Sequence, residues 1–352
     1  MSHTINKSSN FKDKNPLVSI IILTYNSSKF LSKCLDSIAR QTYRNFEIII
    51  VDNASVDGSA ELAKKIGERM GLTRFTVVRN SRNLGYCGGN NVGIRLAKGK
   101  YIAIINPDII LNKHWLERLV AVAESNDKIG MCQGKILYDN TKIINSTGNL
   151  MDIFGAVRCR GEFEIDRGQY DNNSGDFFYV SGAAFLIRKD VLYKVGLFDE
   201  MLFLYHDDVD LSWRVRLLGY VLKYISDAVC FHIKRINKKF IYEKINRTKM
   251  YYVYRNRLII MLKNYAFKNV IKYVPLALIL NILNSIYLTL LKRDCYLYLQ
   301  IKATFDVILK LREILINRKK IQSLRKVDDD DILKYISFSP IELLEFKAII
   351  QK

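Results

Sequence analysis

The first 130 residues alternate between two hydrophobic patterns. Runs of consecutive apolar residues rich in isoleucine and valine occur at 17–24, 46–51, 75–78 and 101–105, and such runs are typical of strands buried on both faces. Between them, apolar residues recur every three or four positions, which predicts helices over 27–38, 58–70, 90–97 and 113–124. This order predicts an α/β fold, with a mainly parallel sheet covered by helices on both faces.

The pattern changes twice further along the chain. Residues 130–176 are irregular, with Gly and Asn turns and short strand candidates. They are followed by expected strands at 180–188, 221–225 and 228–231 and an expected helix at 207–218. After His232 come a basic, tyrosine-rich helical stretch at 241–262, an uncharged run at 274–291 and a basic amphipathic stretch to Lys326. We therefore expect three parts: a lead-in over 1–15, a Rossmann-like domain over 16–235 and a basic helical region over 236–352.

Polar side chains stand where the predicted strands end. They are Thr24-Tyr25-Asn26, Asp52-Asn53, Arg79-Asn80 and Asn106-Pro107-Asp108. Ligands of open α/β sheets bind beyond the carboxyl ends of the strands. The sequence therefore predicts a binding site at this edge.

Two of these positions have chemistry suited to a nucleotide. Asp52 can accept hydrogen bonds from a base and from ribose hydroxyls, although a helix cap or turn is the alternative. Asp108 offers a hard oxygen ligand of the kind that Mg²⁺ or Mn²⁺ prefers, although a cap after Pro107 is the alternative.

The segment Asn83–Gly93 is a glycine-rich turn that opens a helix. Its backbone N–H groups could approach a phosphate or a sugar closely, but a simple turn is the alternative. It matches neither the dinucleotide-binding nor the P-loop motif.

Three acids, Asp207, Asp208 and Asp210, begin the helix predicted at 207–218. Acids stabilise a helix N-terminus, but three in four residues exceed what capping requires. Asp208 lies near the core-facing stripe, so we regard it as a candidate general base. For the histidines His114 and His206 we favour structural roles.

The formal charge of +20 is concentrated in the C-terminal third. Residues 232–326 contain 22 Lys or Arg and 4 Asp or Glu, a net charge of +18. Such a balance favours a polyanionic partner: nucleic acid, anionic lipid or a phosphorylated substrate. The uncharged run is close to the length that spans a bilayer. We hypothesise contact with an anionic membrane face, and a helical bundle or dimer interface is the alternative.

The six cysteines form no CxxC pair and no zinc spacing, so we expect reduced, buried thiols in a cytoplasmic protein. Residues 1–16 are polar and lack an apolar signal core.

Taken together, the motifs resemble those of family 2 glycosyltransferases, especially their rhamnosyltransferase-like branch. The resemblance covers roughly 17–232 and a short later segment around Arg255-Asn256-Arg257. The matching segments are Val18–Asn26, Val51–Ser59, Asn83–Gly93, Ile105–Asp108, Ser181–Arg188, Val195–Glu200 and Asp207–Arg214.

The resemblance implies a glycosyltransferase A-type fold and an inverting single displacement from a nucleoside-diphosphate sugar. Asp52 would contact the nucleoside, Asp108 would hold a divalent metal (Mg²⁺ or Mn²⁺), and Asp208 would be the base. His232 would lie near the metal and diphosphate, and Asp207 stands where Glu is more usual. The remaining donor-site positions would be Thr24, Tyr25, Asn26, Asn83, Gly85, Asn90 and Asn106. Gly182 and Asp207 would lie on the acceptor side.

The resemblance also suggests substrates. We expect a dTDP- or UDP-linked donor, with rhamnose as the candidate sugar, and a saccharide acceptor that is lipid-linked or on a surface. The QxxRW motif of the processive synthases does not occur, which favours single addition. We place the enzyme in the cytoplasm, peripheral at the membrane face, with oligomer formation open.

Other readings remain at this point. A nucleic-acid-binding protein would use the basic region with Tyr251, Tyr252 and Tyr254 as stacking groups. A nucleotidyltransferase or a non-catalytic relative would share the sheet. Binding of nucleic acid leaves the acidic strand ends unexplained.

Overall fold

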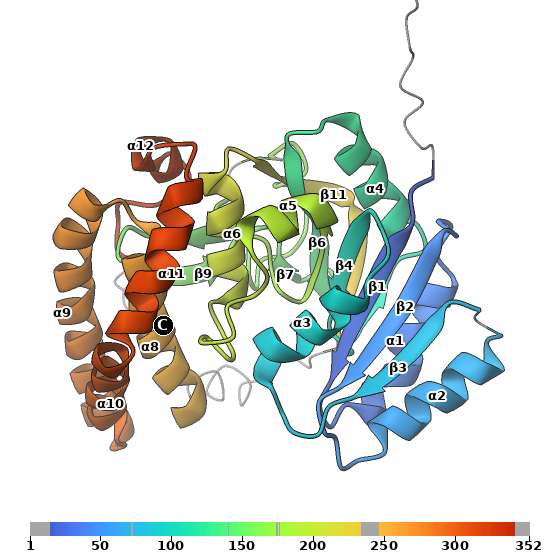
Figure 1. The fold of residues 1–352 in the computed structure, drawn as a ribbon, viewed down its shortest axis with the longest axis horizontal. Helices are drawn as coiled ribbons and strands as arrows, with labels where there is room; N and C mark the ends of the chain where they lie inside the picture. The colour runs from blue at the N-terminus through green and yellow to red at the C-terminus, as the bar shows by residue number, and fades with distance from the viewer. Residues whose placement is uncertain are drawn as a thin grey trace, which may run out of the picture.

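A central mixed sheet organises the protein (Figure 1). The computed structural model describes residues 15–71, 73–139, 141–173, 175, 177–233 and 246–341. Within these residues the main sheet has the order β3-β2-β1-β4-β10-β6-β11-β5, and β7 pairs with β6. Its first four strands are parallel: β1 (Val18–Thr24), β2 (Phe46–Asp52), β3 (Phe75–Arg79) and β4 (Tyr101–Ile105).

The other half of the sheet mixes directions. Strand β10 (Ala184–Arg188) runs antiparallel to both β4 and β6 (Ile129–Tyr138), and β11 (Val221–His232) is parallel to β6. The short strands are β5 (Ile109–Leu111), β7 (Ile144–Ser146), β8 (Asn149–Met151) and β9 (Val157–Cys159). The predicted α/β fold is confirmed, with a sheet that is mostly but not wholly parallel.

Helices cover both faces of the sheet, as the buried strands require. In β1, Ile20 and Ile22 belong to one hydrophobic cluster and Ile21 to the other, because successive side chains of a strand point to opposite faces. The first cluster includes α1 (Ser28–Ala39), α2 (Ser59–Arg69) and α4 (Trp115–Ser125). The second includes α3 (Gly85–Leu96), α5 (Lys189–Val195) and α6 (Asp207–Leu217).

Strand β6 is one continuous strand of ten residues in a stretch where only short strand candidates were expected, and it is the main correction to the predicted sheet. All ten of its residues are buried, although Gln133 and Lys135 interrupt its apolar pattern. Gln133 Nε2 donates to Ser146 Oγ at 2.9 Å, and Lys135 Nζ lies 2.9 Å from Asp166 Oδ2. These internal partners allow polar side chains inside a sheet, and no local pattern reveals them.

Three element bounds also differ from the sequence prediction. Helix α3 begins at Gly85 rather than Asn90, and β10 begins at Ala184 rather than Val180. The two strands expected at 221–225 and 228–231 are one strand, β11, with an irregularity in register between Ile225 and Val229.

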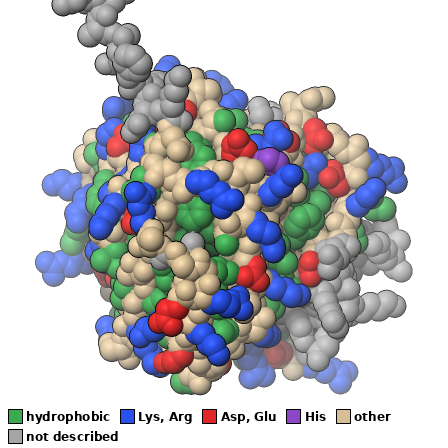
Figure 2. All heavy atoms as spheres, turned by 90° about the vertical axis from the view of Figure 1, so that its right-hand side faces the viewer, with side chains coloured by type: hydrophobic (Ala, Val, Ile, Leu, Met, Phe, Trp, Pro, Cys, Tyr) green, Lys and Arg blue, Asp and Glu red, His purple; other side chains and the backbone are tan. Residues whose placement is uncertain are grey.

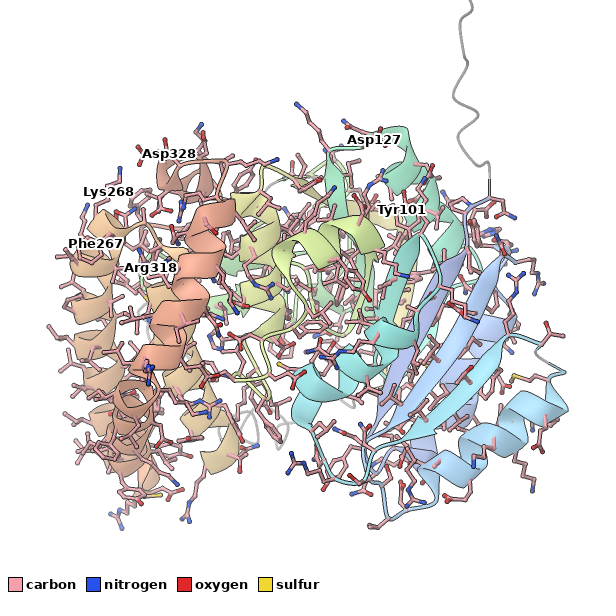
Figure 3. The ribbon with its side chains drawn as sticks, in the orientation of Figure 1. Tyr101, Asp127, Phe267, Lys268, Arg318 and Asp328 are labelled. Atoms are coloured by element: carbon pink, nitrogen blue, oxygen red, sulfur yellow. The ribbon has the colours of Figure 1, made fainter. Side chains whose placement is uncertain are left out.

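The predicted helical C-terminal region is confirmed. It consists of α8 (Arg247–Asn264), α9 (Phe267–Lys292), α10 (Tyr296–Leu309), α11 (Leu311–Leu324) and the short α12 (Asp329–Leu333), while residues 241–245 of the expected helix lie outside the described residues. Tyr265 and Ile314 share the hydrophobic cluster of Ile21. Arg318, labelled in Figure 3, joins α11 to the end of α8 by donating to the carbonyl oxygens of Leu262 and Tyr265. All six cysteines are free.

Candidate active site

The ends of β1 and β2 form the first part of the candidate site. Thr24 and Asp52 are register partners, and Thr24 Oγ1 donates to Asp52 Oδ1 at 2.9 Å. The other carboxylate oxygen accepts from the Ser55 N–H at 3.0 Å, and the Asp52 side chain is fully buried. Asn26 has a φ of 50° and accepts from the Val56 N–H. Tyr25, which is 51% exposed, presents the accessible surface of this turn.

Two asparagines shape the neighbouring loop. Asn53 Nδ2 donates to Asn83 Oδ1 at 2.7 Å and to the Gly85 carbonyl at 3.1 Å, and Asn83 Oδ1 also accepts from the Gly85 N–H. Gly85 has a φ of +71°, and a Cβ there would lie 2.5 Å from the Phe203 carbonyl oxygen. Asn83 and Gly85 thus fix where α3 begins.

The glycines that follow are inside α3, which changes how the motif is understood. A Cβ on Gly89 would lie 2.4 Å from the Leu23 side chain, so these glycines allow the helix to pack closely on β1. Asn90 is buried and donates to the Tyr86 carbonyl at 3.0 Å. Among the described residues, its side-chain oxygen has no hydrogen-bond partner.

A carboxylate and an imidazole meet beyond β4 and β11. His232 Nε2 lies 3.0 Å from Asp108 Oδ2, and His232 Nδ1 lies 3.0 Å from Asn145 Oδ1. With the Asn145 amide oxygen facing Nδ1, the ring donates from Nδ1 and Nε2 is free to bind a metal ion beside the carboxylate; with the amide turned to donate, the Nε2–H tautomer donates to Asp108. The pair therefore suits a divalent metal but does not require one.

The chemistry of these two side chains suits a divalent metal ion, but two ligands alone do not complete a metal site. Among the described residues, no cluster of three or more His, Cys, Asp or Glu side chains could hold a metal ion. Asp108 and His232 would supply an oxygen and a nitrogen, and the remaining ligands would come from diphosphate oxygens and water.

A second carboxylate, Asp208, lies at the start of α6. Its Oδ2 accepts from the Gly182 N–H at 2.8 Å, and the carbonyl of Gly182 accepts from the Tyr86 hydroxyl at 2.6 Å. Burial raises the pKa of Asp208 to about 6, against the opposing effect of its hydrogen bonds from Gly182 and Val209. With a pKa of about 6 the carboxylate is ionised at neutral pH, and the residue is only partly buried.

The neighbouring acids are held differently. Asp210 is fully buried between Lys263 and Arg214; despite that burial its pKa falls to about 2, because those two cations favour the carboxylate. Burial and the charge of Asp208 raise the pKa of Asp207 well above its ordinary value. Asp210 is therefore an ion-paired structural group, and Asp208 is the acid suited to proton transfer.

The sheet brings these groups to one edge. Strand β10 lies between β4 and β6, and the Asn106 N–H donates to the Ala183 carbonyl at 2.8 Å, which places Asn106 beside the Gly182 peptide. Two contacting residues were not among the predicted site residues. Tyr86, which donates to Gly182, lies within the glycine-rich motif Asn83–Gly93. Asn145, which contacts His232, lies in the irregular stretch 130–176.

His114 and His206, the other histidines among the described residues, do not contact the Asp108–His232 pair. His206 is buried at the residue before α6, and burial together with Arg257 and Lys249 lowers its pKa to about 3. His114 contacts Thr42 and Glu117 on the surface.

A mostly parallel sheet with acidic groups at its carboxyl edge is the arrangement expected of a glycosyltransferase A-type fold, in which ligands bind beyond the strand ends. Comparison with known families is consistent with that class. The sequence profile of "Glycosyl transferase family 2" matches residues 19–196. The chain therefore belongs to glycosyl transferase family 2, and the glycosyltransferase class predicted from the motifs is confirmed over the nucleic-acid-binding and nucleotidyltransferase alternatives.

Curated relatives agree on the class. The chain is 30% identical to "Glycosyltransferase GlyG" of Streptococcus pneumoniae serotype 4 over 223 residues, which are 62% of this chain and 71% of that protein. It is 26% identical to "Poly-beta-1,6-N-acetyl-D-glucosamine synthase" of Staphylococcus aureus over 61% of this chain and 49% of that one. The match spans about two thirds of the first relative and half of the second.

Solved structures share the fold. They include "GalNAc-T7 with UDP, GalNAc and Mn2+" (TM-score 0.57, 18% identity, 73% of this chain and 49% of that one). They also include the "Mannosyltransferase PcManGT from Pyrobaculum calidifontis in complex with GDP-Man and Mn2+" (TM-score 0.56, 15% identity, 89% and 86%). A third is "S. aureus TarS 1-349 in complex with UDP-GlcNAc" (TM-score 0.55, 16% identity, 90% and 89%).

Proposed function

We propose that this chain transfers a sugar from a nucleoside-diphosphate donor to an acceptor hydroxyl by a single displacement with inversion. The observation that carries the proposal is the arrangement at the sheet edge. A partly buried carboxylate, Asp208, is held by the Gly182 N–H close to Asn106, and the Asp108–His232 pair lies beyond the same strands. These positions suit a base and a diphosphate site in one reaction.

Asp208 has the role of the general base. Its carboxylate accepts the proton of the acceptor hydroxyl as that oxygen attacks the anomeric carbon, and the bond to the diphosphate oxygen breaks on the opposite side. Hydrogen bonds from Gly182 and Val209 hold the carboxylate in one orientation. Acceptor groups would approach over Gly182, where a side chain would crowd Asp208 and Tyr86.

Asp108 and His232 have the role of the metal site. A divalent cation held by them would neutralise the charge that develops on the leaving diphosphate. The structures of GalNAc-T7 and PcManGT, which share the fold, both contain Mn²⁺ and support this choice. Asn145 holds the imidazole in one orientation by its contact with Nδ1, as hydrogen-bond partners of metal-binding histidines commonly do.

The donor would lie along the ends of β1, β2 and β4. Tyr25 would cover the base, with Thr24, Asn26 and Asp52 shaping the turn beneath it. Asn83, Gly85, Asn90 and Asn106 belong to the same edge. UDP and dTDP are the nucleoside diphosphates that we propose for the donor. Structures that contain UDP and UDP-GlcNAc share the fold, which supports UDP, and rhamnose and N-acetylglucosamine are the sugars to test.

The acceptor is proposed to be a saccharide carried at a membrane, because α9 presents an apolar surface. By length and composition Phe267–Leu291 could cross a membrane, and only 22% of its most apolar window is buried. Its exposed residues include Leu276, Ile279, Leu283 and Leu290. Figure 3 shows the side chains of α9, from Phe267 and Lys268 onward, along the edge of the molecule away from the sheet.

We propose that α9 lies on an anionic membrane surface rather than spanning it. Asn281 and Ser285 are fully buried on its inner side, and Asn281 Oδ1 accepts from Arg257 Nη1 of α8 at 2.6 Å. A spanning helix would have to leave these contacts. Exposed basic residues flank the apolar stripes of α9 and α10, which complements anionic headgroups: Lys268, Lys272, Arg293, Lys302 and Arg312.

The donor site is tested by thermal unfolding with UDP, dTDP, GDP and ADP, each with and without Mn²⁺. A ligand at a hundred times its Kd stabilises by about 2.7 kcal/mol. We expect a Mn²⁺-dependent rise in Tm with UDP or dTDP, and its loss in Asp108→Ala.

The matched control is Asp190→Ala, an exposed acid on α5 beside Lys194, which should keep the shift. Absence of any shift in the wild-type protein, or a shift that persists in Asp108→Ala, would refute the proposed donor site.

A further inference from the structure

The segment that leads into α6 has an unusual backbone. Phe203, Tyr205 and His206 have φ values of 62°, 67° and 61°, and none of them is glycine. Residues other than glycine rarely adopt this conformation, and it persists only where the surroundings impose it. Asp207 and Asp208 follow directly, so whatever imposes this conformation also determines where the first turn of α6 points.

Helix α8 supplies hydrogen bonds that impose it. Arg255 Nη2 donates to the carbonyls of Met201 at 2.8 Å and Leu202 at 3.0 Å. Asn256 Nδ2 donates to the carbonyls of Leu202 at 2.9 Å and of Leu204 and Tyr205, both at 2.8 Å. Five bonds from two adjacent side chains thus reach main-chain oxygens of one short segment.

The two side chains also fix each other. Arg255 Nε donates to Asn256 Oδ1 at 3.0 Å, which turns the NH₂ group of the amide toward the carbonyls. Asn256 is fully buried and Arg255 is nearly so. A buried polar pair of this kind is rigid, because any rotation would leave its donors without partners.

The opposite side of the segment rests on α3. The Cys87 N–H donates to the Phe203 carbonyl, and the Phe203 ring packs where Gly85 leaves room for it. The same ring stacks on Tyr252 of α8, with centroids 5.6 Å apart and planes 18° apart. The segment is therefore held between α8 and the helix that begins at the donor loop.

We propose that Arg255 and Asn256 are positioning residues that set the orientation of Asp208 through residues 201–206. This inference rests on the proposed role of Asp208 as the base. It gives the C-terminal region a part in catalysis, because α8 holds the segment that leads directly into the base. Without the Asn256 amide the segment would relax toward negative φ, and the Asp208 carboxylate would leave the Gly182 N–H.

The test uses Asn256→Asp in the full-length protein. This change keeps the size of the side chain and an acceptor for Arg255, but it replaces the NH₂ donor with an oxygen that faces three carbonyls. We expect kcat to fall about 10- to 100-fold, since a shift of about 1 Å in a reacting group has an effect of that order. The KM for the nucleotide sugar and the Mn²⁺-dependent Tm shift with the diphosphate should stay within about twofold of wild type. Amide hydrogen exchange of residues 201–206 should accelerate.

The matched control is Asn281→Ala. Asn281 is equally buried in the C-terminal helices and also loses a hydrogen bond to an arginine, Arg257, on substitution. It should lose stability while keeping kcat and slow exchange at 201–206. A fall in kcat of the same size in both variants would overturn the proposal, because the effect would then follow stability alone.

Asp208→Asn, measured in parallel, separates this inference from the proposed function. If Asp208→Asn is inactive while Asn256→Asp keeps wild-type kcat, the positioning role is wrong and the base assignment stands. If Asp208→Asn keeps wild-type kcat, the base assignment fails and the positioning role fails with it.

Discussion

At the scale of single residues, three acids in the run Asp207–Asp210 acquire different properties from their surroundings. Asp210 faces two cations, Asp207 faces other acids, and the partly buried Asp208 accepts hydrogen bonds from two peptide N–H groups. Helical spacing and family resemblance indicated Asp208 as the base. The sequence alone does not show that Lys263, more than fifty residues away, neutralises Asp210.

Proton transfer to Asp208 should make the reaction rate depend on pH. The pKa of Asp208 is raised to about 6, and only the ionised carboxylate accepts a proton. We therefore expect kcat/KM to fall as pH decreases through about 6 and to be level from about 7 upward, because kcat/KM follows ionisation of the free enzyme.

Asp208→Asn should lower kcat at pH 7.5 by about a thousandfold or more while leaving the diphosphate-dependent Tm shift in place. Rates of radiolabelled sugar transfer between pH 5 and 8 would measure both effects. A kcat/KM that stays level down to pH 5 would argue against Asp208 as the base.

At the scale of elements, close packing of α3 on the sheet positions the donor loop. A Cβ at Gly93 would lie 2.6 Å from Ile21 Cγ2 and 3.1 Å from Val51 Cγ2. Helix and strand therefore approach more closely here than a side chain would allow. The glycine-rich motif thus has a packing function that its resemblance to a phosphate-binding turn did not suggest.

Gly93→Ala should destabilise the protein by about 1–3 kcal/mol, because overpacking outweighs the roughly 1 kcal/mol that alanine gains over glycine inside a helix. Urea denaturation of the variant would measure this. In an Ile21→Ala background the same substitution should cost little or nothing, since the contacted methyl group is gone. Equal costs in both backgrounds would show that the Ile21 contact is not responsible.

Elements with a regular pattern were predictable, and those with internal polar partners were not. Strands β1, β2 and β4 contain long runs of apolar residues and were found with nearly correct bounds. Strand β6, at the centre of the mixed half, was expected only as short strand candidates, because Gln133 and Lys135 break its apolar pattern and are satisfied by residues distant in sequence. The site residues at regular strand ends stay predictions from local pattern, whereas Asn145, Tyr86 and the contacts of Asn256 depend on tertiary packing and leave no such pattern.

At the scale of the whole molecule, charge and apolar exposure are unevenly distributed. Figure 2, which faces the end formed by α1, α2 and β3, shows basic and acidic side chains interspersed. Residues 247–326, in contrast, contain 17 Lys or Arg and 3 Asp or Glu, a net charge of +14, together with the long exposed apolar stripe of α9. A protein with this asymmetry has one side that is suited to binding a surface with anionic and apolar parts.

Binding to lipid vesicles tests that asymmetry. We expect sedimentation with vesicles that contain anionic lipid at low salt, weaker binding at 0.5 M salt because the charges are screened, and little binding to zwitterionic vesicles. The double substitution Ile279→Ser and Leu283→Ser should weaken binding about tenfold or more, since two large exposed side chains no longer bury apolar surface.

The matched control is Val56→Ser, which removes an apolar side chain that is 90% exposed on the opposite part of the molecule. It should leave vesicle binding unchanged. If the wild-type protein ignores anionic vesicles and instead sediments as a dimer that the double substitution dissociates, α9 is a subunit interface and the membrane proposal is wrong.

The long sequence separations within the site have a consequence for how the protein is made. Asp108 and His232 are 124 residues apart, Tyr86 and Gly182 are 96 apart, and Asn256 reaches back 51 residues to Tyr205. Contacts between such distant segments form late and slowly during folding, because the intervening chain must first be ordered. On the ribosome, β1 to β4 can assemble long before α8 has been synthesised. A nascent chain would thus carry a largely formed donor edge while its base is still unsupported, and sugar transfer would begin only once synthesis has passed the C-terminal helices.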